Sequence, residues 1–228
     1  MLAGMDLLDH FRPPLSERRH WTGQHSAWAA AIAADLNESL PDGWFADSRV
    51  QWHQEADAVV VREDGGFGGG LATAVRPPTR KVVFDASQDL VEVRIVDERD
   101  GQTLAGVIEL VSPSNLRGAD ARDAFVGKCE ALLSGGVGVL VVDVVTTTAV
   151  SLHRDLLARV GDPDAEADPL YAASYALEAG GELQVWYEPL IVGGGLPSMP
   201  LPLLGGPAAA VRLAETYAAA CRNRRIGG

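Results

Sequence analysis

Three charged residues in this sequence have the types and the spacing that metal-dependent chemistry requires. Asp57 lies in the run ADAVVV, Glu109 lies near the end of the run VIELV, and Lys128 follows Glu109 by 128 − 109 = 19 positions. Two carboxylates at neighbouring strand ends can hold a hard divalent cation, Mg²⁺ or Mn²⁺, with water in the remaining positions. A lysine beside them can balance the charge that develops on a phosphodiester under attack. The three residues therefore predict a site for metal-dependent phosphodiester hydrolysis.

The same residues also fit a purely structural arrangement. Carboxylate and lysine combinations of this kind arise by chance in any acidic protein. In that interpretation Asp57 caps a turn, Glu109 pairs with an arginine, and Lys128 is solvated. Glu109 needs an explanation in either case, because residues 107–111 are otherwise apolar. A carboxylate buried among them must be paired, neutralised or bound to a metal.

Other polar residues near the two carboxylates are weaker candidates. His53 and Glu55 precede Asp57 at the alternation of a strand, so all three side chains can share one face. Glu55 is therefore a candidate accessory metal ligand, although a solvated sheet edge fits these residues slightly better. Ser112 and Asn115 follow the strand of Glu109 in the sequence VSPSN.

Neither of the two remaining catalytic arrangements has the surroundings that it needs. Ser112 lacks the G-x-S-x-G elbow of a nucleophile, and we expect it to bond the backbone at the strand end. His153 and Asp155 are two positions apart, so on a helix they point in different directions.

The elements that would position Glu109 and Lys128 lie between Thr103 and Val145. An apolar run over 103–111 predicts a strand, and helical spacing of apolar residues predicts a helix over 119–134. The β-branched run after Gly135 and Gly136 predicts a strand that is covered on both faces. Strand, helix and strand over this length form a right-handed crossover unit. Glu109 then lies near the C-terminal end of its strand, where open α/β sheets place their sites.

The rest of the chain predicts a mixture of helices and strands around this unit. We expect a helix over 24–40, strands over 45–52, 58–61 and 81–84, and a half-exposed strand over 90–97 that forms a hairpin with 103–111. Beyond residue 145 we expect a loop over 156–167, a hairpin of 171–177 with 183–187, an extended edge segment over 193–207 and a helix over 208–221.

Composition limits the class of protein. The 228 residues carry a formal net charge of −12, which opposes non-specific binding to nucleic acids but leaves room for a local metal-bridged site. Cys129 and Cys221 have no metal-ligand spacing, and Cys129 falls on the apolar face of a predicted helix. The first residues lack the pattern of a signal peptide, and no apolar run is long enough to span a bilayer. We expect a cytoplasmic protein without a membrane partner.

Several motifs together resemble a known bacterial family. ADAVVV, then VIELVSPSN, then FVGKCEALLSGGVGVLVVDVV, with the late LPSMPLPLLGG, resemble the domain of unknown function 4058 family over nearly the whole chain. That family is similar to the Uma-two family of putative restriction endonucleases and to the PD-(D/E)xK nuclease-like superfamily.

The resemblance implies a fold and a set of site residues. The fold is α/β, with a restriction-endonuclease-like mixed central sheet flanked by helices and an added C-terminal hairpin and helix. It implies one domain over 1–228, with a core at roughly 24–145 and an elaboration over 146–228. The first acid falls at Asp57, the second at Glu109 and the lysine at Lys128.

Two departures from the family pattern bear on activity. The usual lysine, two positions after the second acid, is replaced by Val111, and Leu116 replaces another lysine of the family's element. We therefore place the lysine's role on Lys128. The resemblance implies a Mg²⁺- or Mn²⁺-dependent nuclease acting on DNA, with a homodimer as a further expectation. The alternative is a catalytically silent member that serves as a binding or assembly module.

Overall fold

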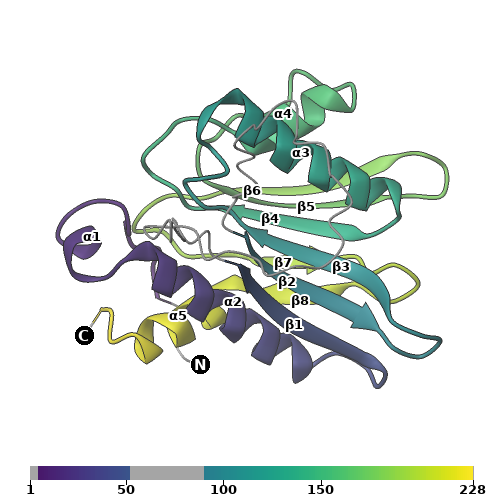
Figure 1. Ribbon diagram of the computed structural model, residues 1–228, viewed down its shortest axis with the longest axis horizontal. Coiled ribbons are helices and arrows are strands. Elements are labelled where there is room, and N and C mark those ends of the chain that lie inside the picture. The colour runs from purple at the N-terminus through teal and green to yellow at the C-terminus, as the bar shows by residue number, and fades with distance from the viewer. Residues whose placement is uncertain (1–4, 52–89, 228) are drawn as a thin grey trace, which may run out of the picture.

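A computed structural model describes residues 5–51 and 90–227, which form a mixed α/β structure (Figure 1). A six-stranded sheet is flanked by helices, and a two-stranded sheet lies beside it. The helices are α1 (Leu15–Arg18), α2 (Trp21–Asn37), α3 (Gly118–Ser134), α4 (Leu152–Arg159) and α5 (Leu213–Asn223). The strands are β1 (Trp44–Gln51), β2 (Leu90–Asp97), β3 (Thr103–Leu110), β4 (Gly138–Asp143), β5 (Tyr171–Leu177), β6 (Leu183–Pro189), β7 (Ser198–Leu201) and β8 (Ala209–Arg212).

The central sheet has the order β1-β2-β3-β4-β5-β6. Every neighbouring pair is antiparallel except β3 and β4, which are parallel and joined by α3. This confirms the predicted crossover unit, because parallel neighbours need a helical connection of this kind. The hairpins β2–β3 and β5–β6 are also as predicted. The second of them extends the central sheet, so residues 171–189 belong to the same layer.

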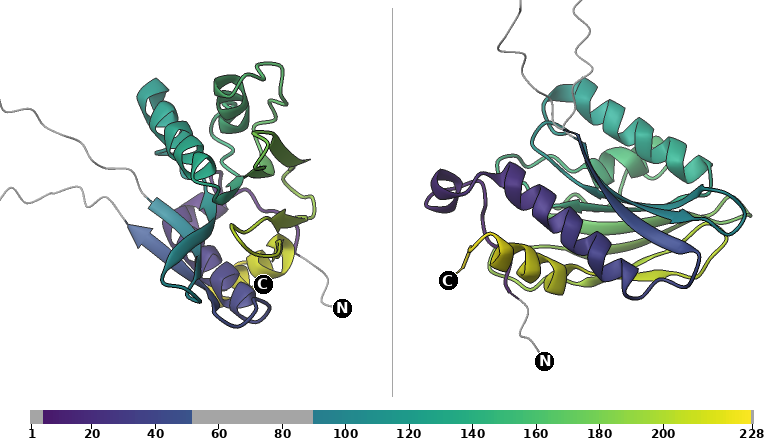
Figure 2. Two further views of the ribbon diagram at one scale, coloured as in Figure 1. Left: turned by 90° about the vertical axis from the view of Figure 1, so that its right-hand side faces the viewer. Right: turned by 60° about the horizontal axis from the view of Figure 1, so that its bottom comes forward.

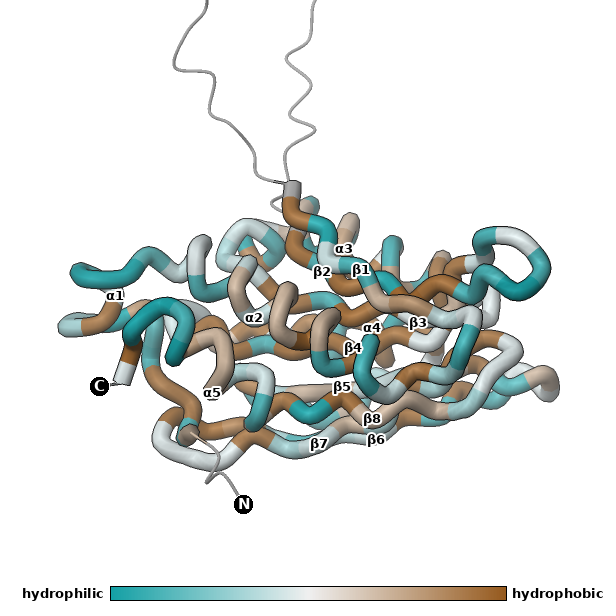
Figure 3. The backbone as a smooth tube through the Cα atoms, turned by 90° about the horizontal axis from the view of Figure 1, so that it is seen from below, coloured by the Kyte–Doolittle hydropathy of each residue, from teal (hydrophilic) through white to brown (hydrophobic). Residues whose placement is uncertain are grey.

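Helices cover the two faces of the sheet in pairs (Figure 2). α3 and α4 pack on one face, and α2 and α5 pack on the other together with β7 and β8. Each face of the sheet carries an apolar core, because side chains alternate along the strands. Val91, Val93 and Ile95 face α2, whereas Val139 and Val141 face α3. Hydrophobic segments accordingly run through the middle of the molecule along the strands (Figure 3).

One extra residue in β3 sets the register of the β2–β3 hairpin. Val96 pairs with Leu104, but Ile95 pairs with Gly106, so Ala105 is a bulge. The carbonyl group of Ala105 accepts a hydrogen bond from the backbone N–H of Leu204, 3.0 Å away. Side chains alternate between the two faces of a sheet. This one-residue shift therefore decides which residue of β2 lies opposite each later residue of β3.

Two sequence predictions after residue 145 are wrong in their boundaries. The predicted loop over 156–167 begins inside α4, whose N-cap Ser151 accepts a hydrogen bond from the N–H of Arg154 and whose Leu156 and Leu157 are buried. The final helix begins at residue 213 rather than 208, because residues 209–212 pair with β7.

The segment 193–207 supplies β7, an edge strand of the separate two-stranded sheet. One further expectation needs correction. Residues 90–97 are not a half-exposed strand, because both faces of β2 are largely covered. The predicted strands over 58–61 and 81–84 lie outside the described residues.

Candidate functional site

Two glutamates face each other across the β2–β3 hairpin. Glu92 on β2 is the register partner of Glu109 on β3, and both side chains are buried on the face of the sheet that α3 covers. The bulge at Ala105 produces this meeting. Without the bulge, the register that pairs Val96 with Leu104 would pair Glu109 with Val91. The side chain of Val91 points to the opposite face of β2 from that of Glu92.

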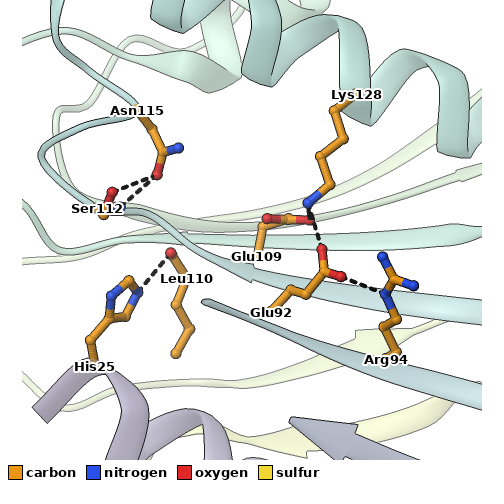
Figure 4. Close-up of polar contacts among 8 residues, drawn as sticks. All are labelled: His25, Glu92, Arg94, Glu109, Leu110, Ser112, Asn115 and Lys128. Carbon is orange, nitrogen blue, oxygen red and sulfur yellow. Dashed lines mark hydrogen bonds and ion pairs between the residues drawn. The ribbon is translucent and has the colours of Figure 1, made fainter. Parts of the chain in front are cut away.

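Lys128 of α3 lies between these two carboxylates. Its Nζ atom is 2.5 Å from Oε2 of Glu92 and 2.5 Å from Oε1 of Glu109 (Figure 4). Phe125, Val126 and Cys129 anchor α3 in the apolar core, which leaves Lys128 at the helix edge and directed towards the hairpin. Helix packing therefore places the ammonium group, and no local sequence motif around Glu109 is needed.

Arg94 completes the group from the same strand as Glu92. Its Nε contacts Oε1 of Glu92, so one carboxylate binds two cations through its two oxygens. The side chains of Arg94 and Lys128 are each 31% exposed, whereas that of Glu92 is fully buried. The site thus has a floor of carboxylates and a rim of cationic groups that reach solvent.

Burial of Glu109 and the second cation at Glu92 give the two carboxylates different proton affinities. Burial raises the pKa of Glu109 to about 7; Lys128 opposes the rise and Glu92 adds to it. Burial also disfavours the charged form of Glu92, but Lys128 and Arg94 outweigh it and lower the pKa of that carboxyl. For Lys128 the two carboxylates overcome desolvation and raise the pKa. The surroundings of Glu92 therefore favour its ionised form, whereas burial favours the protonated form of Glu109.

The end of β3 is held by α2 and by the loop that follows the strand. Nε2 of His25, on α2, donates a hydrogen bond to the carbonyl oxygen of Leu110, 2.8 Å away. In the following loop, Asn115 Oδ1 accepts from the backbone N–H of Ser112 at 2.8 Å and from its hydroxyl at 3.0 Å. Ser112 was expected to bond the backbone, but its hydroxyl contacts the side chains of Asn115 and Ser114. These two candidates thus support the strand end.

Of the residues proposed from the sequence, the structure brings Glu109 and Lys128 together. Asp57 and Glu55 lie outside the described residues. His153 and Asp155 point apart as predicted: His153 Nδ1 contacts the hydroxyl group of Tyr175, and Asp155 pairs with Arg122.

Sequence reasoning missed Glu92 and Arg94. Both alternate with apolar residues in LVEVRIVD, a pattern that assigns charged side chains to solvent. The sequence did offer one indication: the predicted helix over 119–134 had to cover part of the sheet next to the strand of Glu109, and the neighbouring strand of Glu92 and Arg94 could lie beneath it as well. The bulge, which decides the pairing of Glu92 with Glu109, has no clear mark in the sequence.

The carboxylate chemistry fits a hard divalent cation. Oxygen ligands from one or two carboxylates, completed by water and substrate phosphate, are the usual environment of Mg²⁺ in enzymes. Oε1 of Glu109 is buried and, among the described residues, accepts no hydrogen bond of good geometry; its close neighbour is the Lys128 ammonium. No cluster of three or more potential metal-ligating side chains occurs within residues 5–51 and 90–227. Glu92 and Glu109 therefore supply a two-carboxylate donor set.

Comparison of the chain with protein-family models, with curated proteins and with solved structures found no match. Within the part of the chain that the structure describes, no helix has the length and apolarity needed to cross a bilayer. The chemistry of the four charged side chains, Glu92, Arg94, Glu109 and Lys128, is therefore the basis for a functional assignment.

Proposed function

We propose that the protein is a divalent-metal-dependent phosphodiesterase that acts on DNA. The observation that carries this proposal is the convergence of Glu92, Glu109 and Lys128, which come from two strands and a helix and meet within 2.5 Å contacts. Such a set combines ligands for a hard cation with a positive charge for a phosphate. The mixed sheet flanked by helices is compatible with the restriction-endonuclease-like fold that the sequence resemblance implies.

Each residue has a distinct role in this proposal. Glu92 and Glu109 hold the cation, which when bound supplies Lewis-acid polarisation of a phosphodiester and activation of water. Lys128 offers its ammonium group to the non-bridging oxygens of the substrate. Asp57 and Glu55 remain proposed additional ligands, and a homodimer remains the proposed oligomer.

The choice of lysine at position 128 supports a chemical role. Lys128 and Lys81 are the only two lysines among the chain's 19 basic residues, so the other 17 are arginines. A chain that otherwise uses arginine for its positive charges has a compact ammonium at this position. Lysine is a mobile point charge that binds phosphate, whereas the planar guanidinium of arginine needs more space between two carboxylates.

The cationic rim gives a local reason why an acidic protein could bind DNA. Arg94 and Lys128 are partly exposed above the carboxylates, and Arg49 is the exposed β1 partner of Glu92 in the sheet register. Arg49, as the register partner of Glu92, shares its face of the sheet, so all three charges lie near the site at which a phosphate would bind. Long-range repulsion from the net charge of −12 would slow association without preventing local contacts, since salt screens it beyond about 10 Å.

Nicking of supercoiled plasmid DNA with Mg²⁺ or Mn²⁺ tests the proposal. We expect slow cleavage by the wild type and its loss in Glu109→Gln and Glu92→Gln. Glu130→Gln is the matched control, because Glu130 is a glutamate of the same helix as Lys128 that pairs with Arg159 instead. Equal activity of Glu109→Gln and wild type would refute the assignment.

A catalytically silent binding module is the second candidate. It is favoured by the balance of charge within the group, in which two buried carboxylates are matched by two partly exposed cations. Such a network can serve packing alone. Failure of the wild type to cleave single-stranded, double-stranded and branched DNA, together with no change in melting temperature on adding Mn²⁺, would select this candidate.

A further inference from the structure

We infer that Lys128 is a tethered competitor for the cation position, so that the site alternates between a state closed by its own ammonium and a state open to a divalent metal. This inference concerns how the proposed metal site is regulated, and it rests on that proposal. Its basis is geometric: Nζ of Lys128 occupies the point where oxygens from both Glu92 and Glu109 converge.

The two cations cannot share this point. A metal ion bound by the same oxygens would lie within a few ångströms of the ammonium, and two like charges at that separation repel strongly where water is largely excluded. Entry of a divalent cation therefore requires Nζ to leave. The reverse also holds, because loss of the metal leaves two facing carboxylates that attract the ammonium back.

The surroundings of Lys128 allow this exchange without a change in the fold. Its side chain is 31% exposed and projects from the edge of α3, whose position is fixed by other, buried residues. Rotation of the side chain alone can carry Nζ to solvent. Glu92 keeps a cationic partner throughout, since Arg94 binds its other oxygen.

Displacement has a consequence for the substrate. The released ammonium would join Arg94 at the exposed rim, where both can contact a phosphate. Binding of the metal ion to Glu92 and Glu109 would then also release Lys128 to bind phosphate together with Arg94. In this arrangement the protein without metal has a weaker affinity for DNA, because one of its two rim charges is held by the carboxylates.

The rate at which Lys128 is acetylated in the wild-type protein reports whether its ammonium group is bound to the carboxylates or released. Acetylation to low conversion, with and without Mg²⁺ at constant ionic strength, is followed by mass spectrometry of the two lysine-containing peptides. Lys81, the other lysine of the chain, serves as the internal reference. We expect Mg²⁺ to raise the acetylation rate of Lys128 several-fold relative to Lys81, and Glu109→Gln to remove this effect.

An unchanged rate at Lys128 would overturn the inference, whether or not Mg²⁺ raises the melting temperature. DNA cleavage is scored separately. Cleavage with an unchanged labelling rate would support the proposed function and reject the competition. Faster labelling without cleavage would support the competition for a metal ion and reject the cleavage of DNA.

Metal affinity provides a second, independent test. Lys128→Met removes the competitor while keeping an unbranched side chain, and Arg94→Met removes a neighbouring charge that does not lie between the carboxylates. We expect the Mn²⁺ dissociation constant, measured by calorimetry, to fall about tenfold or more in Lys128→Met and much less in Arg94→Met. Equal effects in the two variants would indicate general electrostatics and would contradict occupancy of the cation position.

Discussion

Replacing Glu109 by glutamine should make the protein relatively more stable as the pH rises. The pKa of Glu109 is about 7 in the folded protein, against an ordinary value of 4.5, mainly because the carboxyl is buried. Between these two pH values the folded state keeps a proton that the unfolded state has lost. Wild-type stability must therefore fall through this window, by about 3 kcal/mol in all.

Glutamine removes that loss because it does not titrate. Near pH 4.5 the variant and the wild type both have a neutral side chain at position 109, so their free energies of unfolding should be similar. By pH 8 the variant should have gained about 3 kcal/mol over the wild type. A functional carboxylate that is held at a cost to stability is a common property of active sites.

Urea unfolding followed by tryptophan fluorescence at several pH values between 4.5 and 8 measures this difference. Other groups titrate in the same range: burial lowers the pKa of His10 to about 4 and raises that of Asp143 to about 8. Subtracting the wild-type curve from the variant curve cancels both contributions. An advantage of Glu109→Gln that does not grow with pH would refute the reasoning, since Lys128 would then hold Glu109 ionised throughout.

Glu92→Gln is the control with the opposite sign. Despite burial, Lys128 and Arg94 lower the pKa of Glu92, so its charge contributes stability that is present above pH 4.5 and is lost as the pH falls through the folded-state value. The glutamine variant should be the less stable protein at neutral pH, and its deficit should shrink on acidification. The same direction of change in both variants would show that the two facing carboxylates are not distinguished as described.

Lys128→Ala should keep metal binding but reduce DNA cleavage about a hundredfold or more, because it removes a charge and no ligand; unchanged cleavage would show that the lysine has no role. Gly138→Ala should lower the free energy of unfolding by about 1–3 kcal/mol or more, because the added methyl group would overlap the backbone carbonyl oxygen of Pro202. Gly180→Ala, where the methyl group would meet open space, should be neutral in the same urea unfolding assay. Asn115→Ala should cost about 1–3 kcal/mol in the same assay by leaving the buried N–H of Ser112 unsatisfied; a neutral result would mean that water replaces the amide.

The crossover unit could be predicted because its signals are local. Apolar spacing changes from continuous to helical and back between residues 103 and 145, and parallel strands joined by a helix are nearly always built in one way. The same unit placed Lys128 on the helix above Glu109, and the structure has these two residues in contact. Chain order and periodicity were therefore sufficient for half of the site.

The other half depends on tertiary structure that no local pattern encodes. Glu92 reaches Glu109 only because Ala105 bulges and shifts the register by one residue. Alternating charges in β2 resembled a solvated face, since nothing in that segment indicates that a helix edge and Lys128 cover it. Residues 209–212 likewise had helical composition but pair with β7, which shows tertiary contacts overriding propensity.

Glu92 and Glu109 hold a divalent cation in this proposal, and Lys128 otherwise occupies the place of that cation. Anomalous diffraction from crystals soaked in Mn²⁺, measured near the manganese absorption edge, tests whether the two cations exchange. We expect an anomalous peak between the two carboxylates, with the ammonium of Lys128 moved out towards solvent. Crystals that show no peak at saturating Mn²⁺, with Lys128 still bound to both glutamates, would contradict it.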